Sequence, residues 1–267
     1  MWQACDRAEL NAARNDTHRP PADGHFPFSF LLAGLYLTSP PQPGYERLDT
    51  PMASGVALAE LIQPLREIVS ARSVYAHAAA HPERRELSGR GPAYAIPLGS
   101  ARVVVRHVRH GGLLAPLTGD LFLPPTRAPY ELAVSHRLRD GGVSTPQVVA
   151  YITYPAAMFL RRADVITREI PDATDLGTLL GSASRSASDR AAVWESVSLL
   201  IASLAAAGAY HEDLNVRNIL VSAGADGRHT AHAIDVDRVV WGHPGDPALV
   251  RTNLDRLHRS ARKQGLL

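Results

Sequence analysis

The chain has 267 residues and a formal net charge of +2, and hydrophobic residues make up 45% of it. It can therefore bury a large core in one domain or two lobes, and its small charge excess gives no reason to expect a nucleic-acid partner. A single cysteine, Cys5, excludes a disulfide scaffold. The longest apolar run, residues 26–37, is shorter than the roughly 20 residues that a membrane-spanning helix needs.

Residues 1–51 differ from the rest of the chain because they are rich in proline and show no sustained hydrophobic period. We expect them to form a disordered tail, or to precede the true start of the protein. From Met52 onward, apolar residues at helical spacing as far as Ile68 predict the first helix.

The middle of the chain predicts strands around one main helix, because short apolar runs alternate with turn residues. The predicted elements are a β-hairpin over 94–98 and 102–108 with its turn at Gly99-Ser100, a helix over 126–139 that ends at Gly141-Gly142, and paired strands over 148–152 and 158–170.

The second half is mainly helical. Its predicted elements are a short helix over 176–180, a long helix capped by Ser188 that stops at Gly208, a hairpin over 218–221 and 231–234, and a last helix over 247–263. We expect an α+β fold in which residues 52–170 form a strand-rich N-terminal lobe and residues 171–267 a reduced, mostly helical C-terminal lobe.

The most informative segment runs from His211 to Asn218 and reads His-Glu-Asp-Leu-Asn-Val-Arg-Asn. It fits H-x-D-L-x-x-x-N, the catalytic loop of kinase-type phosphotransferases. Further along the chain, Asp235 ends an apolar strand, where this architecture keeps a metal-binding aspartate. The two signals at this interval are far more specific together than either is alone, and they indicate phosphoryl transfer.

The chemistry explains these residue types. Transfer of a γ-phosphoryl group needs a carboxylate that orients and deprotonates the acceptor hydroxyl, and Asp213 fits this catalytic role. Magnesium prefers oxygen ligands, so the amide oxygen of Asn218 and the carboxylate of Asp235 are suitable donors. His211 is interpreted as a structural residue that orients the loop, with direct acid-base chemistry as the alternative.

Upstream, strand alternation places Val104 and Arg106 on one face of the strand over 102–108. These positions correspond to the adenine-contacting and phosphate-contacting residues of the kinase V-A-I-K motif. Arg106 occupies the lysine position, and Lys263 is the only lysine in the chain. Glu131 is the candidate ion-pair partner of Arg106, and the alternative is a solvated helix glutamate.

Two further assignments rest on position in the chain. Gly89 and Gly91 lie in Ser88-Gly89-Arg90-Gly91, where a glycine-rich loop would cover the phosphates of the nucleotide. Glu169, at the end of the strand over 158–170, lies where a hinge would offer backbone groups to adenine.

These motifs resemble the lipopolysaccharide kinases, specifically the 3-deoxy-D-manno-octulosonic acid (Kdo) kinases. The residues that carry the resemblance, besides the loop and the Ile234-Asp235-Val236-Asp237-Arg238 segment, are Gly89-Arg90-Gly91, Val105-Arg106-His107 with Arg109, Gly111-Gly112-Leu113, Thr126-Arg127-Ala128, Asn253-Leu254, Arg256-Leu257 and Arg259-Ser260. The resemblance covers roughly residues 84–263 in collinear order.

The resemblance implies a protein-kinase-like bilobal fold and an enzyme that uses ATP and Mg²⁺ to phosphorylate a hydroxyl of Kdo on lipid A. It assigns Asp213 as the base, Asn218 and Asp235 as metal ligands, and Arg106 with Glu131 to the phosphates. The sequence departs from the family at Val236, where relatives carry an aromatic residue, and in the proline-rich stretch after Gly112, so the acceptor is the least secure assignment.

Two alternatives stay open. One is a kinase of the same minimal fold with another small-molecule or protein acceptor, and the other is a non-catalytic nucleotide-binding pseudokinase. Glu212 and Asn215 argue against a serine/threonine protein kinase, because they replace an arginine that reads an activation-loop phosphate and a lysine that contacts the transferring phosphate.

The last predicted helix carries Leu254 and Leu257 on one face and basic residues around it. It is interpreted as an ordinary closing helix, and the alternative is an interfacial helix that contacts an anionic membrane. A second basic cluster could face an anionic acceptor; it comprises Arg102, His107, Arg109 and His110. We expect a cytoplasmic protein that is either free or peripheral on the cytoplasmic face of the inner membrane.

Overall fold

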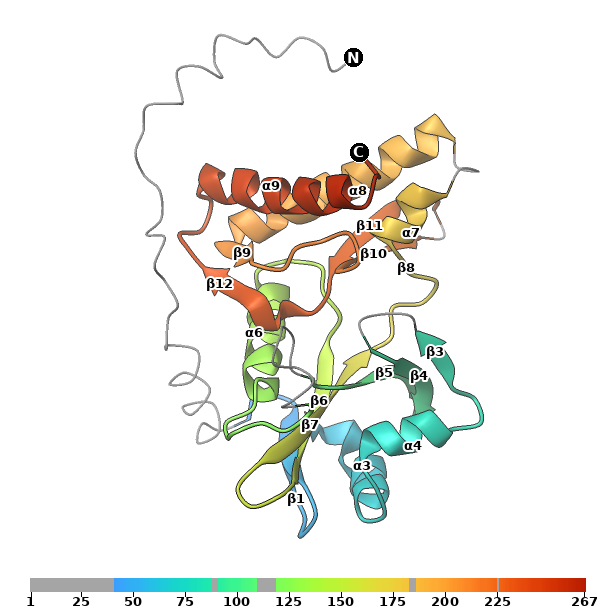
Figure 1. Cartoon of the computed structure of the whole chain (residues 1–267), viewed down its shortest axis with the longest axis vertical. Coiled ribbons are helices and arrows are strands. Elements are labelled where there is room, and N and C mark those ends of the chain that lie inside the picture. The colour runs from blue at the N-terminus through green and yellow to red at the C-terminus, as the bar shows by residue number, and fades with distance from the viewer. Residues whose placement is uncertain (1–40, 88–90, 110–118, 183–185, 225) are drawn as a thin grey trace.

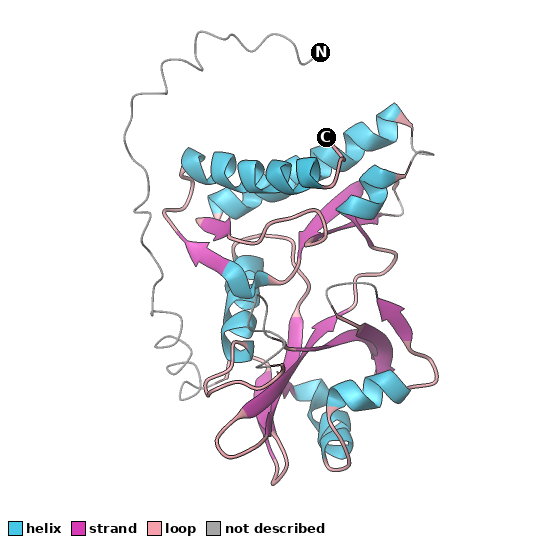
Figure 2. Ribbon diagram, viewed as in Figure 1, coloured by secondary structure: helices cyan, strands magenta, loops and turns pink. Residues whose placement is uncertain are grey.

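The computed structural model describes residues 41–267 except 88–90, 110–118, 183–185 and 225. Strands dominate one end of the molecule and helices the other, and α6 (Ala128–Asp140) lies between the two ends (Figures 1 and 2). This is the α+β, bilobal arrangement that the sequence predicts, with the elements in the predicted order of hairpin, helix, strand pair and helical lobe.

The N-terminal lobe is built on a seven-stranded antiparallel sheet in the order β1-β2-β6-β7-β5-β4-β3. The predicted hairpin is confirmed, and Gly99 turns it with φ of 58°, a conformation that glycine adopts without strain. The strands of this sheet are β1 (Tyr45–Asp49), β2 (Ser54–Leu58), β3 (Arg85–Leu87), β4 (Ala93–Leu98), β5 (Ala101–His107), β6 (Val148–Pro155) and β7 (Arg161–Arg168).

Helices cover both faces of this sheet. On one face, α3 (Ile62–Val69) and α4 (Val74–Ala80) bury an apolar cluster that includes Val103 and Val105 of β5. On the other face, α6 packs Ala128 and Leu132 against the sheet. The alternation of β5 therefore directs Val103 and Val105 into the first face, and Val104 and Arg106 to the side that faces the helical lobe.

The C-terminal lobe packs its helices around one core of buried aliphatic residues. Within it, α8 packs on both β11 and α9, and the short strands carry the motif residues at their ends (Figure 1). Its elements are β8 (Thr174–Asp175), α7 (Leu176–Gly181), α8 (Ala187–Ala206), β9 (Ala209–His211), β10 (Ile219–Ala223), β11 (His229–Ala233), the 3-10 turn η3 (Val236–Arg238), β12 (Val239–Trp241) and α9 (Pro247–Lys263).

The structure corrects the prediction for the start of the chain. Residues 45–49 are not a tail, because β1 pairs along its length with β2. The helix predicted from Met52 begins only after β2 and the 3-10 turn η2 (Ala59–Leu61). Gly55 explains this: a Cβ there would lie 2.1 Å from the carbonyl oxygen of Tyr151, so strand pairing with β6 overrides the local helical period. Residues 1–40 lie outside the described residues.

The long helix α8 begins earlier than predicted. Its N-cap is Ser186, whose hydroxyl accepts a hydrogen bond from the backbone amide of Asp189 at 3.1 Å, and not Ser188. Because the helix begins there, the acidic side chain of Asp189 lies in its first turn, where a negative charge interacts favourably with the helix dipole. Gly208 follows the helix with φ of 74°, as its predicted stop requires.

The predicted basic cluster on β5 is not a single surface. His107 lies 2.6 Å from Oδ1 of Asp164 and 2.9 Å from Oδ2 of Asp120, and Asp164 is fully buried. Burial alone would lower the pKa of His107, but its hydrogen bonds with Asp164 and Asp120 outweigh burial and raise the pKa above the usual 6.5. Arg102 pairs with Glu169 instead, and His110 lies outside the described residues.

The raised pKa of His107 makes the stability of the protein depend on pH. A histidine whose pKa is raised by folding stabilises the folded state. This contribution is fully present below the unfolded pKa of about 6.5, and it is lost as the pH rises through the folded pKa. Urea unfolding between pH 6 and pH 9 should therefore show a falling free energy of unfolding for the wild type. His107→Gln should begin about 3 kcal/mol lower at pH 6, because Asp164 loses its charged partner, and should show a smaller fall.

Arg162→Gln provides the control for this experiment. Arg162 pairs with Asp120 from an exposed position, so its loss should cost less than about 1 kcal/mol. Parallel pH profiles for the wild type and His107→Gln would contradict the assigned pairing.

Candidate active site

The loop over residues 211–218 connects β9 to β10 and is tightened by its own side chains. Asn215 accepts a hydrogen bond from the amide of Arg217 at 2.9 Å and donates one to the carbonyl of Asp213 at 2.9 Å. The amide of Asn218 donates to the carbonyl of Asn215 at 2.9 Å. These contacts fix the backbone around Asp213, as a positioned catalytic carboxylate requires.

His211 is fully buried behind this loop. Its Nε2 lies 3.1 Å from the carbonyl of Ile234, and its Nδ1 accepts a hydrogen bond from the amide of Asp213 at 3.3 Å. This pattern requires the neutral tautomer with the proton on Nε2, and burial lowers the pKa of His211 in agreement. The contacts fit the predicted orienting role, because both ring nitrogens bond backbone groups.

Asn218 joins the two acidic positions of the motif. Its Nδ2 donates to the carbonyl of Asp213 at 2.9 Å and lies 3.4 Å from Asp213 Oδ2. The backbone carbonyl of Asn218 accepts a hydrogen bond from the backbone amide of Ile234 at 3.0 Å, and Asp235 directly follows Ile234 in the chain. The structure therefore joins the side chains of Asp213 and Asn218 and places Asp235 one residue beyond a backbone bond to Asn218.

Asp235 has a left-handed backbone, with φ of 59° and ψ of 47°, which is uncommon for residues other than glycine, asparagine and aspartate. This turn ends the extended run after β11 and begins η3. It leaves Oδ1 of Asp235 3.5 Å from Nη2 of Arg106, so the carboxylate faces the sheet of the other lobe.

Arg106 and Glu131 form the predicted ion pair between β5 and α6. Nearby Glu131, Asp235 and Asp237 raise the pKa of Arg106 even though burial opposes this. Burial raises the pKa of Glu131 to about 7 against the lowering effect of Arg106, and the charges of Asp237 and Asp235 add to the rise. One guanidinium thus lies among three carboxylates.

This excess of negative charge fits a cation. Asp237 pairs with Arg127 at 3.3 Å, but burial and the charge of Asp235 still raise the pKa of Asp237. The described residues contain no group of three histidine, cysteine or acidic side chains that could hold a metal. Oδ1 of Asn218 accepts no hydrogen bond from them, so it and the Asp235 carboxylate fit magnesium, which takes few protein ligands and shares substrate phosphates.

Three contacts attach α6 to the segment that follows Asp235. Arg127 pairs with Asp237, the hydroxyl of Tyr130 donates to the carbonyl of Val239 at 2.8 Å, and the guanidinium of Arg137 lies 3.6 Å from the ring centre of Trp241. They span most of the length of α6. The helix that carries Glu131 is therefore held to the C-terminal lobe, and this keeps Glu131 at Arg106.

The remaining predicted nucleotide-binding residues lie along the sheet edge that faces the helical lobe. Val104 shares a face with Arg106 on β5, and Gly91 lies between β3 and β4, whereas Gly89 lies outside the described residues. Glu169 follows β7 as expected, but its amide donates to the carbonyl of Arg102 at 3.0 Å. Because that N–H is already hydrogen-bonded, the backbone carbonyl of Glu169 is the group that could accept a hydrogen bond from adenine.

One face of α9 supports the catalytic loop, a role that was not predicted. Asn253, which is fully buried, accepts from the amide of His211 at 3.1 Å and donates to the carbonyl of Ala209 at 3.0 Å. Arg256 reaches Asp213, and Ser260 accepts from the amide of Val216 at 3.3 Å. These residues are three and four positions apart, so they lie on one face of the helix. Polar residues on a face that is otherwise buried were the sequence signal that could have predicted this supporting role.

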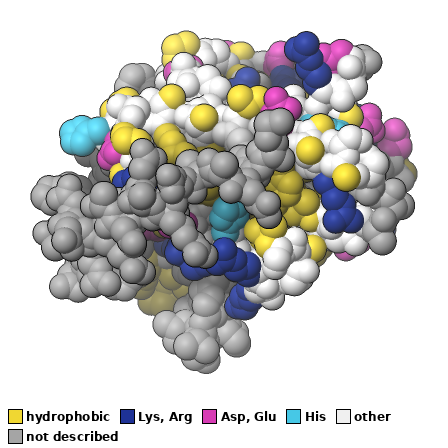
Figure 3. All heavy atoms as spheres, turned by 90° about the horizontal axis from the view of Figure 1, so that it is seen from above, with side chains coloured by type: hydrophobic (Ala, Val, Ile, Leu, Met, Phe, Trp, Pro, Cys, Tyr) yellow, Lys and Arg dark blue, Asp and Glu magenta, His cyan; other side chains and the backbone are white. Residues whose placement is uncertain are grey.

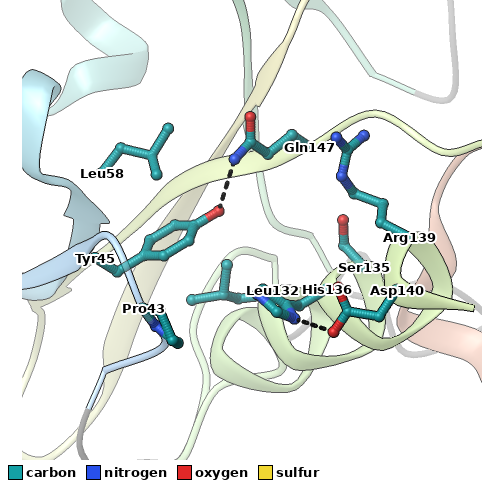
Figure 4. Close-up of a pocket in the computed structure, with 9 residues that line it drawn as sticks. All are labelled: Pro43, Tyr45, Leu58, Leu132, Ser135, His136, Arg139, Asp140 and Gln147. Atoms are coloured by element: carbon teal, nitrogen blue, oxygen red, sulfur yellow. Dashed lines mark hydrogen bonds and ion pairs between the residues drawn. The ribbon is translucent and has the colours of Figure 1, made fainter.

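A cavity of about 120 Å³ lies elsewhere, between the start of β1 and the second half of α6. Tyr45, Leu132, His136 and Gln147 are among its lining residues, and His136 pairs with Asp140 at its edge (Figure 4). None of the residues predicted for catalysis, nucleotide binding or metal binding lines it. A second cavity, of about 200 Å³, is lined by Glu169 but by none of the other predicted residues.

Known proteins are similar to this chain over about two thirds of its length. The sequence model of the lipopolysaccharide kinase (Kdo/WaaP) family matches residues 80–266. A 3-deoxy-D-manno-octulosonic acid kinase of Vibrio vulnificus (strain CMCP6) is 32% identical over 181 residues, which are 66% of this chain and 72% of that one. The kinase of the same name from Xanthomonas oryzae pv. oryzae (strain PXO99A) is 33% identical over 185 residues, 66% of this chain and 68% of that one.

A solved structure of WaaP in complex with acyl carrier protein is also similar. It has a TM-score of 0.48 and 19% sequence identity, and the match covers 77% of this chain and 81% of that chain.

The supporting role of α9 is testable at Asn253. Asn253→Ala leaves the buried amide of His211 and the carbonyl of Ala209 without partners, so the free energy of unfolding should fall by about 2–3 kcal/mol. Any phosphotransferase activity should also fall, because the loop loses a backbone anchor. Thr252→Ala is the matched control, because its hydroxyl bonds only its own helix, at the carbonyl of Ala248. Equal urea midpoints for the two variants would contradict the role of Asn253.

Proposed function

Because the chain belongs to the lipopolysaccharide kinase (Kdo/WaaP) family, we propose that it transfers the γ-phosphoryl group of ATP to a hydroxyl of the Kdo sugar of Kdo–lipid A. Membership identifies the protein as a kinase, a phosphotransferase that uses ATP and acts on an alcohol group. The observation that carries the proposal is the convergence of Asp213, Asn218 and Asp235 opposite the Arg106–Glu131 pair.

In this proposal Asp213 is the catalytic base. One of its carboxylate oxygens accepts the proton of the acceptor hydroxyl while the hydroxyl oxygen forms a bond to the γ-phosphorus. The bond between that phosphorus and the oxygen that leaves with ADP breaks in the same displacement. Asn218 and Arg256 hold the carboxylate in place, so the geometry is preorganised.

The nucleotide would lie between the sheet and the catalytic loop. Arg106, held by Glu131, is placed to contact phosphate oxygens, and Val104 on the same face is placed to contact adenine. Gly89 and Gly91 would lie over the phosphates, and the carbonyl of Glu169 would accept from the base. Arginine can serve at the lysine position because its planar fork can bond both a carboxylate and a phosphate.

Magnesium would be held by Asn218 Oδ1 and the carboxylate of Asp235 together with the phosphates. When bound, it neutralises negative charge on the phosphates and fixes their orientation. Asp235 lies between Asn218 and Arg106, so it is well placed to link a cation to the phosphate-contacting arginine.

Two observations support Kdo as the acceptor. Two kinases named for that sugar are 32–33% identical over about two thirds of this chain. In addition, Asn215 is folded back on the loop, so it does not reach out as a peptide kinase's lysine would. Another small-molecule or protein acceptor remains the second candidate. A pseudokinase is disfavoured, because Asp213, Asn218 and Asp235 are all retained in the sequence.

We also propose that the protein works at the cytoplasmic face of the inner membrane, where ATP meets a lipid-linked acceptor. No helix among the described residues is long and apolar enough to cross a bilayer. Leu257 and Ala261 of α9 are buried in the core, which supports the interpretation of α9 as a closing helix. Seen from the α8–α9 end, both basic and acidic side chains lie among hydrophobic and uncharged ones (Figure 3), so contact with anionic lipid would involve basic residues that have acidic neighbours.

The proposed function is tested with Kdo–lipid A, ATP and magnesium, by mass analysis for one added phosphoryl group. The wild type should form this product, and Asp213→Asn should reduce the rate roughly a hundred- to ten-thousandfold at unchanged thermal stability, because only the base is lost. Glu212→Gln, at the exposed neighbouring residue, should stay within about twofold. Retained activity in Asp213→Asn would refute its role, and a wild type inactive on this acceptor would refute the acceptor.

The metal assignment is tested by titration calorimetry with a non-hydrolysable ATP analogue. The wild type should bind the analogue about tenfold or more tightly with magnesium than with EDTA, and Asp235→Asn should lose most of that gain. Asparagine tolerates the left-handed backbone, so the fold should be kept. Asp226→Asn, on the exposed turn between β10 and β11, is the control and should retain the gain. Equal gains in both variants would exclude Asp235 as a ligand.

A further inference from the structure

The side chain of Arg256 reaches from α9 to the proposed catalytic carboxylate. Its Nη2 lies 3.2 Å from Asp213 Oδ1, while Nδ2 of Asn218 approaches Oδ2 of the same residue at 3.4 Å. The Arg256 side chain is 38% exposed, so its guanidinium lies at the open side of the site. A cation is thus placed beside the group that would receive the acceptor hydroxyl.

This contact uses few of the hydrogen-bond donors of the guanidinium. Arginine carries five N–H donors in a planar fork that matches a carboxylate. Among the described residues, Arg256 makes a hydrogen bond to Asp213 alone. The helix does not need Arg256 for its attachment, because Asn253, Leu257 and Ser260 already fix α9 to the loop and the core.

Asn215, the loop residue at the position of a protein kinase's lysine, does not supply a cation at this point. Asn215 turns back to bond Asp213 and Arg217 through the backbone. Arg106, across the site, is committed to Glu131 and lies near Asp235. Arg256 therefore offers partly exposed N–H donors beside Asp213.

We propose that Arg256 is a specificity-determining residue that binds a carboxylate of the acceptor while it orients Asp213. This inference rests on the proposed function, because Kdo is an acid that carries a carboxylate and hydroxyls on one small sugar. One edge of the guanidinium holds Asp213, and the exposed donors hold the acid of the sugar. The hydroxyl to be phosphorylated is then presented to a carboxylate that shares the same arginine.

The test compares two water-soluble acceptors, the deacylated Kdo glycolipid and its Kdo methyl ester, so that no lipid surface is involved. Rates are measured for the wild type, Arg256→Gln, Arg256→Lys and the control Arg259→Gln, an exposed arginine one turn along α9. The wild type and the control should prefer the acid by about tenfold or more in kcat/KM, with KM carrying most of the difference.

Arg256→Gln should lower kcat/KM for the acid by a similar factor and show no preference between acid and ester, whereas Arg256→Lys should restore part of the preference. Binding of the ATP analogue should be unchanged in every variant. If Arg256→Gln still prefers the acid as strongly as the wild type, the inference is wrong although the function stands. If nucleotide binding weakens instead, Arg256 contacts the phosphates and the inference is equally overturned. A wild type that phosphorylates neither acceptor refutes the proposed function itself.

Discussion

The candidate site depends on the ion pair between Arg106 and Glu131, because it joins the sheet, α6 and the loop that carries Asp235. The guanidinium of Arg106 lies between the carboxylates of Glu131 and Asp235, which would repel one another without it, while the nearby Asp237 is also paired with Arg127. Arginine suits this position better than lysine because its fork can bond Glu131 with one nitrogen and still face Asp235 and an incoming phosphate with others. The chain accordingly assembles its site around an arginine.

Both halves of the site are held by packed helices. Behind the catalytic loop, α9 supplies Asn253 and Ser260 to backbone amides. In front of it, α6 is fastened to the segment after Asp235 through Tyr130 and Arg137. The helix that carries Glu131 and the strand that ends at Asp235 are thus fixed to each other by contacts inside the described fold, with no phosphorylated residue needed to bring them together.

The features that could be predicted from the sequence are local in the chain. Hairpin turns, helix stops and the motif spacing depend on neighbours a few residues apart, so β4–β5, α6 and the contact between Asp213 and Asn218 followed from the sequence. Contacts between distant segments did not. The pairing of β1 and β2, the division of the basic residues of β5 between Asp164 and Glu169, and the support from α9 are decided by tertiary packing, which local patterns do not encode.

The position of α9 in the chain has a consequence for how the protein forms. The amide of His211 finds its partner in Asn253, 42 residues later. During synthesis the loop leaves the ribosome before the helix that stabilises it, and closing so long a separation costs chain entropy before any contact is gained. The catalytic motif is therefore fully anchored only once α9 has packed against the loop.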